Sequence, residues 1–204
     1  MKNTIKCYKL TKQDIKIAHD KFVVYEPRDL FYRTAIELVG LAINKKTSLS
    51  IADALAVLLQ TWNKMYYRYK RFDNKHFEDI ESLIKKHLPK IIKLRKQSIE
   101  NFNQKDECDI EKIFQGFENV LGPTGAAKCL HLLAPCYFPL WDRAIAKSYG
   151  FPLGKKGFNA ENYLHFMEVQ KKQSQFLGGY KKIKRNPLKA IDEYNYCKFT
   201  KRWI

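Results

Sequence analysis

Apolar residues recur every three or four positions along most of the chain, which is the spacing that places them on one face of a helix. Signals for strands are rare, and only "KFVVYEP", residues 21–27, predicts a short extended segment. The sequence therefore predicts an all-α fold of about nine helices. The predicted helices are residues 29–44, 50–72, 75–102 as two pieces bent near Pro89, 106–122, 125–134, a helix beginning at or just after Asp142, about 160–177 and about 187–196.

Several helix starts carry residues that can satisfy free backbone N–H groups. Ser50 is suited to cap the helix that follows it, and Asp53 adds a polar partner in its first turn. Asp29 and Asn159 are the other two candidates for N-caps. We find no linker and no internal repeat, so we expect residues 1–204 to form a single helical domain, with two lobes around a cleft as the alternative.

The charge balance is strongly basic, because 38 Lys and Arg residues face 21 Asp and Glu residues, for a net charge of +17. Such an excess favours nucleic acid as partner first and an acidic membrane surface second, while a generally lysine-coated surface is the alternative. The amino terminus lacks the apolar core of a secretory signal, and no run approaches the roughly 20 apolar residues of a membrane span. We expect a monomeric cytoplasmic protein, associated with the nucleoid if the source is prokaryotic.

Cysteine usage argues against metal centres and against a disulfide framework. The cysteines are odd in number, lie far apart and include no CxxC pair. The tight four-cysteine cluster of an iron–sulfur centre is missing, and free thiols are the simplest interpretation. We expect no metal site and no cofactor. The cysteines are Cys7, Cys108, Cys129, Cys136 and Cys197.

The segment around Gly122 predicts two helices joined by a tight turn. Gly122 ends the first helix, Pro123 and Thr124 begin the second, and this helix–hairpin–helix covers about residues 110–135. The unpaired N–H groups at the start of a helix are a natural seat for a DNA phosphate, which they bind without reading the sequence. We therefore expect Gly122, Thr124 and Gly125 to contact DNA.

The stretch "NVLGPTGAAKCLHLL…YFPLWD", within residues 119–149, resembles the hairpin and catalytic segment of the helix–hairpin–helix DNA glycosylase superfamily. Gly122 matches the last hairpin glycine, Ala126 the small helix residue and Asp142 the catalytic aspartate. The resemblance implies a multi-helix glycosylase-like fold, double-stranded DNA as partner, and hydrolysis of the N-glycosidic bond of a damaged or mismatched base flipped from the duplex. It also implies that the hairpin can hold a structural monovalent cation. An uncharacterised branch of the superfamily is one reading of the match.

Two positions depart from the family pattern. Val120 replaces the first hairpin glycine, so the turn is less flexible. In the lyase-competent branches, a lysine that forms a Schiff base precedes the aspartate at the position of Thr124, and a threonine cannot form an imine. A monofunctional glycosylase is the simplest inference. Lys128 lies on the same helix face and can replace the missing amine in an abasic-site lyase reaction, while a surface or phosphate-binding lysine is the alternative.

Asp142 is a lone acid between Trp141 and Arg143. Cleavage of an N-glycosidic bond builds positive charge on the sugar, and a fixed carboxylate stabilises that charge and can orient or deprotonate a nucleophile. Many aspartates at helix starts serve only as N-caps, which is the alternative role. The two roles are compatible, and we expect Asp142 to be catalytic.

A flipped base needs flat apolar surfaces to stack on. Core packing is the alternative for each aromatic candidate, and a structural role is the alternative for a histidine on an apolar helix. One polar candidate, Gln60, belongs to "AVLLQTW", which is faintly similar to a family segment near the flipped base. The candidates for the base pocket are Trp62, Tyr66, Trp141, Gln60 and His131.

The basic run of residues 181–189 predicts phosphate contacts through Lys181, Lys182, Lys184 and Arg185, with a solvated loop as the alternative. The leading hypothesis is a DNA repair glycosylase. The second is a non-enzymatic DNA-binding protein that keeps the hairpin while its aspartate only caps a helix. The third is an RNA-binding or toxin–antitoxin-type interaction protein, which only the charge supports.

Overall fold

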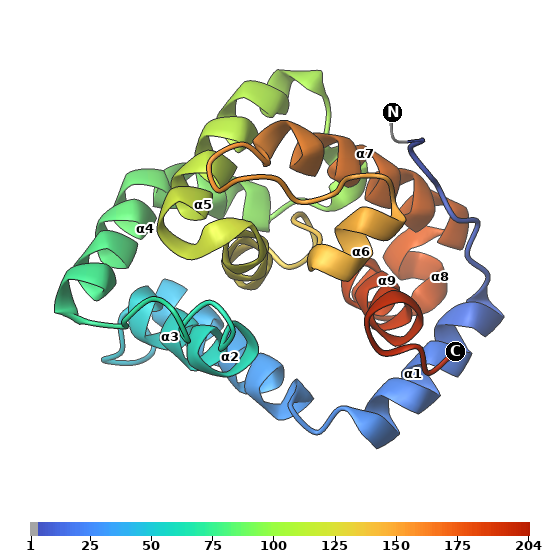
Figure 1. Ribbon diagram of the computed structural model, residues 1–204, viewed down its shortest axis with the longest axis horizontal. Helices are drawn as coiled ribbons and strands as arrows, with labels where there is room; N and C mark the ends of the chain where they lie inside the picture. Colours follow the sequence, from blue (N-terminus) through green and yellow to red (C-terminus); the bar gives the residue numbers. More distant parts are fainter. Residues whose placement is uncertain (1–3) are drawn as a thin grey trace.

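Helices account for the regular structure of residues 4–204, which are the residues that the computed structural model describes (Figure 1). No strand occurs among these residues, and the nine α-helices confirm the predicted all-α fold. Two short elements, the 3₁₀ turn η1 and the π-helical turn η2, complete the set. The bounds are α1 Lys12–Tyr25, α2 Asp29–Ile43, α3 Ile51–Trp62, α4 Asn74–Arg95, η1 Ile99–Asn101, α5 Gln104–Leu133, α6 Arg143–Ser148, α7 Ala160–Leu177, α8 Gly179–Ile183, α9 Pro187–Asn195 and η2 Tyr196–Lys201.

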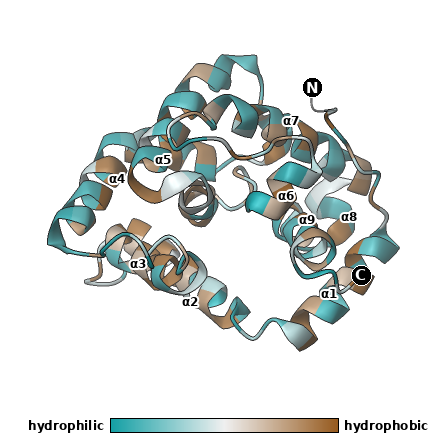
Figure 2. Cartoon of the chain, viewed as in Figure 1, coloured by the Kyte–Doolittle hydropathy of each residue, from teal (hydrophilic) through white to brown (hydrophobic). Residues whose placement is uncertain are grey.

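The second half of α5 lies at the centre of the core. Every residue from Gly125 to Leu133 is buried except Lys128, and α2, α3, α4 and α7 all pack against α5. Hydrophobic residues dominate α3 and this part of α5, whereas hydrophilic residues cover much of α4 (Figure 2). A smaller apolar cluster joins α1 to α9 through residues such as Phe22 and Ile191. Lys128 is therefore the one partly exposed position on an otherwise enclosed helical segment.

The helical path of α5 breaks at Gly122. Its φ of 72° and ψ of 168° lie far from helical values, so two helical parts are joined through one residue. The two parts run in different directions (Figure 1). Essentially only glycine adopts this conformation, because a Cβ atom would clash with the neighbouring backbone. The chain therefore turns at the residue that the sequence predicts, but through a one-residue break rather than a separate hairpin loop.

The predicted extended segment at residues 21–27 is wrong, because most of it forms the last turns of α1. Ile15, Ala18 and Phe22 are buried at helical spacing, and Thr11 begins the helix with a capping box. The helical spacing and the cap outweigh the local preference of two valines for strands.

The helix predicted for residues 50–72 begins as expected but ends early. Ser50 accepts a hydrogen bond from the Asp53 N–H at 3.0 Å, which confirms the predicted cap. The helix ends at Trp62, and turns follow. Here Asn63 donates to the carbonyl of Leu121 at 3.4 Å, and the Tyr66 hydroxyl donates to that of Val120 at 2.7 Å. These bonds hold the turn segment against the Gly122 break.

Three smaller expectations have different outcomes. The predicted division near Pro89 is wrong, since α4 is one helix and its proline lies on the exposed side. Asp29 is the first residue of α2 rather than its N-cap, and its carboxylate lies 3.1 Å from Lys189 Nζ instead. Asn159 does occupy the N-cap of α7, but its side chain bonds to Glu118 rather than to the helix.

Candidate functional site

Asp142 is the N-cap of α6, and both of its carboxylate oxygens accept hydrogen bonds. Oδ1 accepts from the backbone N–H of Ile145 at 2.8 Å, and Oδ2 accepts from the hydroxyl of Thr200 at 2.7 Å. The side chain is partly buried. The capping role is thus observed, and the partial exposure leaves the carboxylate open to a second role.

Lys128 lies on the second part of α5 and points toward the end of α3. Its ammonium donates a hydrogen bond to the backbone carbonyl of Trp62, whose ring centre is 6.0 Å away. Burial lowers the pKa of Lys128 to about 8, and the negative charge of Asp142 opposes this change. The interpretation as a surface lysine does not fit this position. Near pH 8 about half of these side chains carry a neutral, nucleophilic amine.

Asp142 and Lys128 line one small pocket between α1, α5 and α9. Its volume is about 70 Å³. A cavity of roughly 150 Å³ accepts benzene, so an aromatic base does not fit this pocket unless part of its wall moves. The lining residues are Phe22, Glu26, Arg28, Trp62, Lys128, Leu140, Trp141, Asp142, Ile145, Asp192 and Tyr196.

A wider groove, with a volume of about 650 Å³, passes the same carboxylate and the Gly122 break. Gly122, Thr124 and Gly125 line the groove, so the three predicted DNA contacts of the hairpin lie together on its wall. Because some side chains line both spaces, they form the boundary between groove and pocket. These shared residues are Arg28, Trp62, Lys128, Asp142 and Tyr196.

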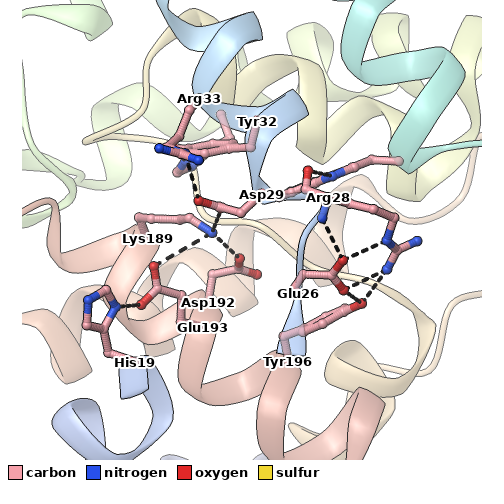
Figure 3. Close-up of polar contacts among 12 residues, drawn as sticks. His19, Glu26, Arg28, Asp29, Tyr32, Arg33, Lys189, Asp192, Glu193 and Tyr196 are labelled. Atoms are coloured by element: carbon pink, nitrogen blue, oxygen red, sulfur yellow. Dashed lines mark hydrogen bonds and ion pairs between the residues drawn. The ribbon is translucent and has the colours of Figure 1, made fainter. Parts of the chain in front are cut away.

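One wall of the pocket is a clamp of Glu26, Arg28 and Tyr196 (Figure 3). The tail helix offers Tyr196 as a residue that can help to close a base pocket, but no sequence signal indicates Glu26 or Arg28. Arg28 donates through Nε and Nη2 to the two oxygens of Glu26, each at 2.7 Å, and Tyr196 donates to Glu26 at 2.5 Å. Burial acts to raise the pKa of Glu26, but the bonds from Arg28 and Tyr196 outweigh it and lower that pKa to about 2. No sequence pattern joins these residues, since Glu26 and Tyr196 lie 170 positions apart.

The interpretation of Asp142 as a lone acid is wrong in three dimensions. Glu26 and Asp192 line the same pocket. Glu26 is paired with Arg28, whereas Asp192 is buried with a pKa raised to about 7, mainly by that burial. The site therefore holds three carboxyl groups in three different environments.

The aromatic candidates for the base pocket lie at the site but are already engaged. Trp62 and Trp141 line the pocket and Tyr66 the groove. The indole N–H of Trp141 donates to the carbonyl of Pro123 at 3.1 Å, and that of Trp62 donates to the backbone carbonyl of Arg28 at 2.9 Å. Trp141 is almost fully buried, so core packing accounts for most of its surface.

Gln60 and His131 do not reach the site. Gln60 is exposed and lines neither the pocket nor the groove. His131 is fully buried, with its two ring nitrogens bonded to the Phe138 carbonyl at 2.8 Å and the Tyr32 hydroxyl at 3.0 Å. Burial lowers the pKa of His131 to about 4, so the ring is neutral at pH 7. The histidine packs in the core, and the expectation that it contacts a base is corrected.

The four side chains predicted to bind phosphate line neither the pocket nor the groove. Lys181, Lys182 and Lys184 are exposed, and none of them lines either space. The guanidinium of Arg185 lies 2.6 Å from the carboxylate of Glu193, which occupies it within the fold. Any phosphate contact of these lysines would be made on a different surface from that of the Gly122 break.

The five cysteines are free thiols. Within residues 4–204, no group of three or more His, Cys, Asp or Glu side chains is arranged to hold a metal ion. No helix in this part of the chain is both long enough and apolar enough to cross a bilayer.

Comparisons of the chain with protein-family models, with curated proteins and with solved structures found no match. The resemblance of residues 119–149 to the glycosylase superfamily therefore stays a prediction.

Proposed function

We propose that the protein is a monofunctional DNA glycosylase that uses Asp142 as its catalytic carboxylate and double-stranded DNA as its partner. One observation carries the proposal: Asp142 lies at the boundary of a pocket and a groove, and the groove is also lined by Gly122, Thr124 and Gly125. Residues that match the two parts of the family motif thus share one surface. The net charge of +17 favours a polyanion there.

The chemistry of this arrangement suits cleavage of an N-glycosidic bond. A partly exposed carboxylate beside the groove stabilises the cation that forms on the deoxyribose as the base leaves. The clamp of Glu26, Arg28 and Tyr196 forms the wall that must open to admit a flipped base, because the closed pocket is too small. Lys128 lies in the same pocket, and its lowered pKa makes it the only residue there that we assign to an additional lyase step.

The second candidate function is DNA binding without catalysis. Both carboxylate oxygens of Asp142 already accept hydrogen bonds, as expected of a residue that only caps α6 and holds η2. In that case the groove binds the DNA backbone and the pocket stays closed.

Asp142→Asn separates the two candidates. Asparagine is also a good N-cap, so the variant keeps the bond to Ile145 and loses the negative charge together with the oxygen that accepts from Thr200. The substrates are duplexes that each carry one oxidised, alkylated, deaminated or mispaired base. For a glycosylase we expect single-turnover base release to fall about 100-fold or more, with duplex affinity unchanged.

If the native protein releases no base from any duplex, the glycosylase proposal fails and the binding protein remains. Borohydride trapping on an abasic duplex tests Lys128 separately. A trapped adduct that disappears in Lys128→Met would contradict the monofunctional assignment.

A further inference from the structure

Asp192 is a buried carboxyl group that the proposed mechanism has not used. Its residue is 8% exposed, and it lines the same pocket as Asp142 and Lys128. Among the described residues no side chain or backbone group donates a hydrogen bond to it. Within residues 4–204 its one ion pair is with Lys189, at 3.8 Å (Figure 3). A buried carboxyl group with so few partners, facing a pocket, points to a ligand rather than to a structural role.

Lys189 cannot balance the charge of Asp192 alone, because three carboxylates share it. The Lys189 ammonium lies 3.1 Å from Asp29 and 3.8 Å from both Asp192 and Glu193 (Figure 3). Asp29 also pairs with Arg33 at 3.5 Å, and Glu193 also pairs with Arg185 at 2.6 Å. Among the described residues, Asp192 is therefore the one of the three carboxylates that has no second cation within 4 Å. Poor compensation of a buried charge favours the protonated form of Asp192.

The other groups near Asp192 determine how readily it holds this proton. Burial raises its pKa to about 7, the charges of Glu193 and Asp142 also raise it, and Lys189 and Lys128 lower it. Arg28 is paired with Glu26, so it supplies little net charge. The titratable and charged groups around Asp192 are Glu26 at the end of α1, Arg28, Asp29 and Tyr32 at the start of α2, Lys128 of α5, Asp142 before α6, Lys189 and Glu193 of α9, and Tyr196 and Cys197 of η2.

Asp142 and Asp192 therefore differ although they line one pocket. Asp142 receives two hydrogen bonds, as suits a carboxylate acceptor, and Asp192 receives none. Two carboxyl groups in such unlike environments divide the roles of base and acid between them. The partly exposed Asp142 is suited to the charged role and the enclosed Asp192 to the protonated one.

We propose that Asp192 is the second catalytic residue of the site and donates a proton to the departing base, directly or through one water in the pocket. This inference rests on the proposed glycosylase function. The bond between C1′ of the deoxyribose and the base nitrogen breaks, its electron pair goes to the base, and the base takes the proton of Asp192. A water molecule adds its oxygen to C1′ and gives a proton to Asp142. Exchange with solvent then restores both carboxyl groups.

The test is the pH profile of single-turnover base release by the native protein and by Asp192→Asn. For the native protein we expect the rate to fall about tenfold per pH unit above roughly pH 7, because Asp192 loses its proton there. For Asp192→Asn we expect a rate about 100-fold lower at pH 6, no such fall at higher pH, and unchanged duplex affinity.

Asp29→Asn is the matched control, since Asp29 contacts Lys189 but does not line the pocket. Its pH profile should keep the fall above pH 7. A native rate that stays constant or rises from pH 6 to pH 8 overturns the role of Asp192, and this measurement needs no variant to fold. If the rate of folded Asp192→Asn still falls above pH 7, the role of Asp192 is overturned as well. In either case base release by the native protein leaves the glycosylase proposal standing. If the native protein releases no base, both proposals fail.

Discussion

Two lysines lie near the ring of Trp62, but their ammonium groups have different surroundings. The ammonium of Lys189 is 5.5 Å from the ring centre and that of Lys128 is 6.0 Å from it. Lys189 also lies over the rings of Phe22 and Tyr32, at 4.2 Å and 4.6 Å, and has three carboxylates around it. Lys128 has one backbone carbonyl as its hydrogen-bond acceptor and no ion pair within 4 Å among the described residues.

The difference separates a structural cation from a reactive one. The surroundings of Lys189 compensate for the loss of water around its charge, so the ion holds α2 and α9 together. The surroundings of Lys128 compensate poorly, which is why its pKa falls to about 8. A partly buried lysine without a carboxylate partner is available for binding and chemistry, and Lys128 lines the pocket with Asp142.

Replacing each lysine by methionine should expose this difference, and the larger effect belongs to Lys189. Lys189→Met leaves Asp192 buried with no ion-pair partner among the described residues, whereas Asp29 keeps Arg33 and Glu193 keeps Arg185. Removal of one partner from a buried ionic group costs about 3–5 kcal/mol, so we expect a loss of that size in the free energy of unfolding, measured in urea. A loss below about 1 kcal/mol would show that the cluster does not stabilise the fold.

The lysine comparison also shows what the sequence could and could not predict. Helical spacing predicts the all-α fold, and the capping box at Ser50 and the break at Gly122 lie where local patterns place them. Such features depend on residues within a few positions of one another. The positions of Asp142 and Lys128 in one groove are consistent with the motif because the two lie only 14 positions apart.

The rest of the site could not be predicted, because its contacts join distant segments. Lys189 pairs with Asp29 across the whole chain, and Glu26 meets Tyr196 in the same way. Nothing in the local sequence of the basic run shows that Lys189 turns inward while Lys181 stays exposed. That difference follows from the packing of α9 against α1 and α2, which only the structure gives.

The region of Lys128 depends on the Gly122 break, and a substitution there should have the second largest effect. Alanine at Gly122 would have to adopt a φ of 72°, with its Cβ 3.2 Å from the ring of Tyr66. We expect Gly122→Ala to cost about 1–3 kcal/mol of stability and to weaken duplex binding.

Gly40→Ala is the matched control for Gly122→Ala. Gly40 lies within α2, and an added Cβ would come no closer than 3.7 Å to the atoms around it. Because alanine favours helix, this variant should be as stable as the native protein or more so by up to about 1 kcal/mol. Equal effects of the two substitutions in thermal unfolding would contradict the account of the break.

Lys128→Met should have a smaller effect on stability, and one that depends on pH. In the folded protein the pKa of Lys128 is about 8, against an ordinary value of 10.5. At pH values between these two pKa values the unfolded chain binds more protons than the folded one. The free energy of unfolding of the native protein therefore increases as the pH rises through this range. Methionine removes this dependence. We expect the variant to melt roughly 2–4 °C higher than the native protein at pH 7, and the gap to narrow as the pH approaches 10. If the difference in melting temperature widened as the pH rises, folding would not lower the pKa of Lys128.

The smallest expected effect on stability comes from Thr200→Val, which removes the hydroxyl that donates to Asp142 Oδ2. Valine keeps the shape of threonine, and the bond from Ile145 to Oδ1 still caps α6, so the loss should be only about 0.5–1.5 kcal/mol.

The functional effect of Thr200→Val separates the two roles of the Asp142 carboxylate. If Asp142 only caps the helix, duplex binding and base release should fall no further than the small loss of stability explains. If Asp142 also stabilises a sugar cation, its charge must be held in position by the Thr200 bond, and base release should fall further than stability does. Single-turnover release compared with urea unfolding of the same variant decides between them, because the variant removes the partner of Oδ2 and leaves the cap bond to Oδ1 in place.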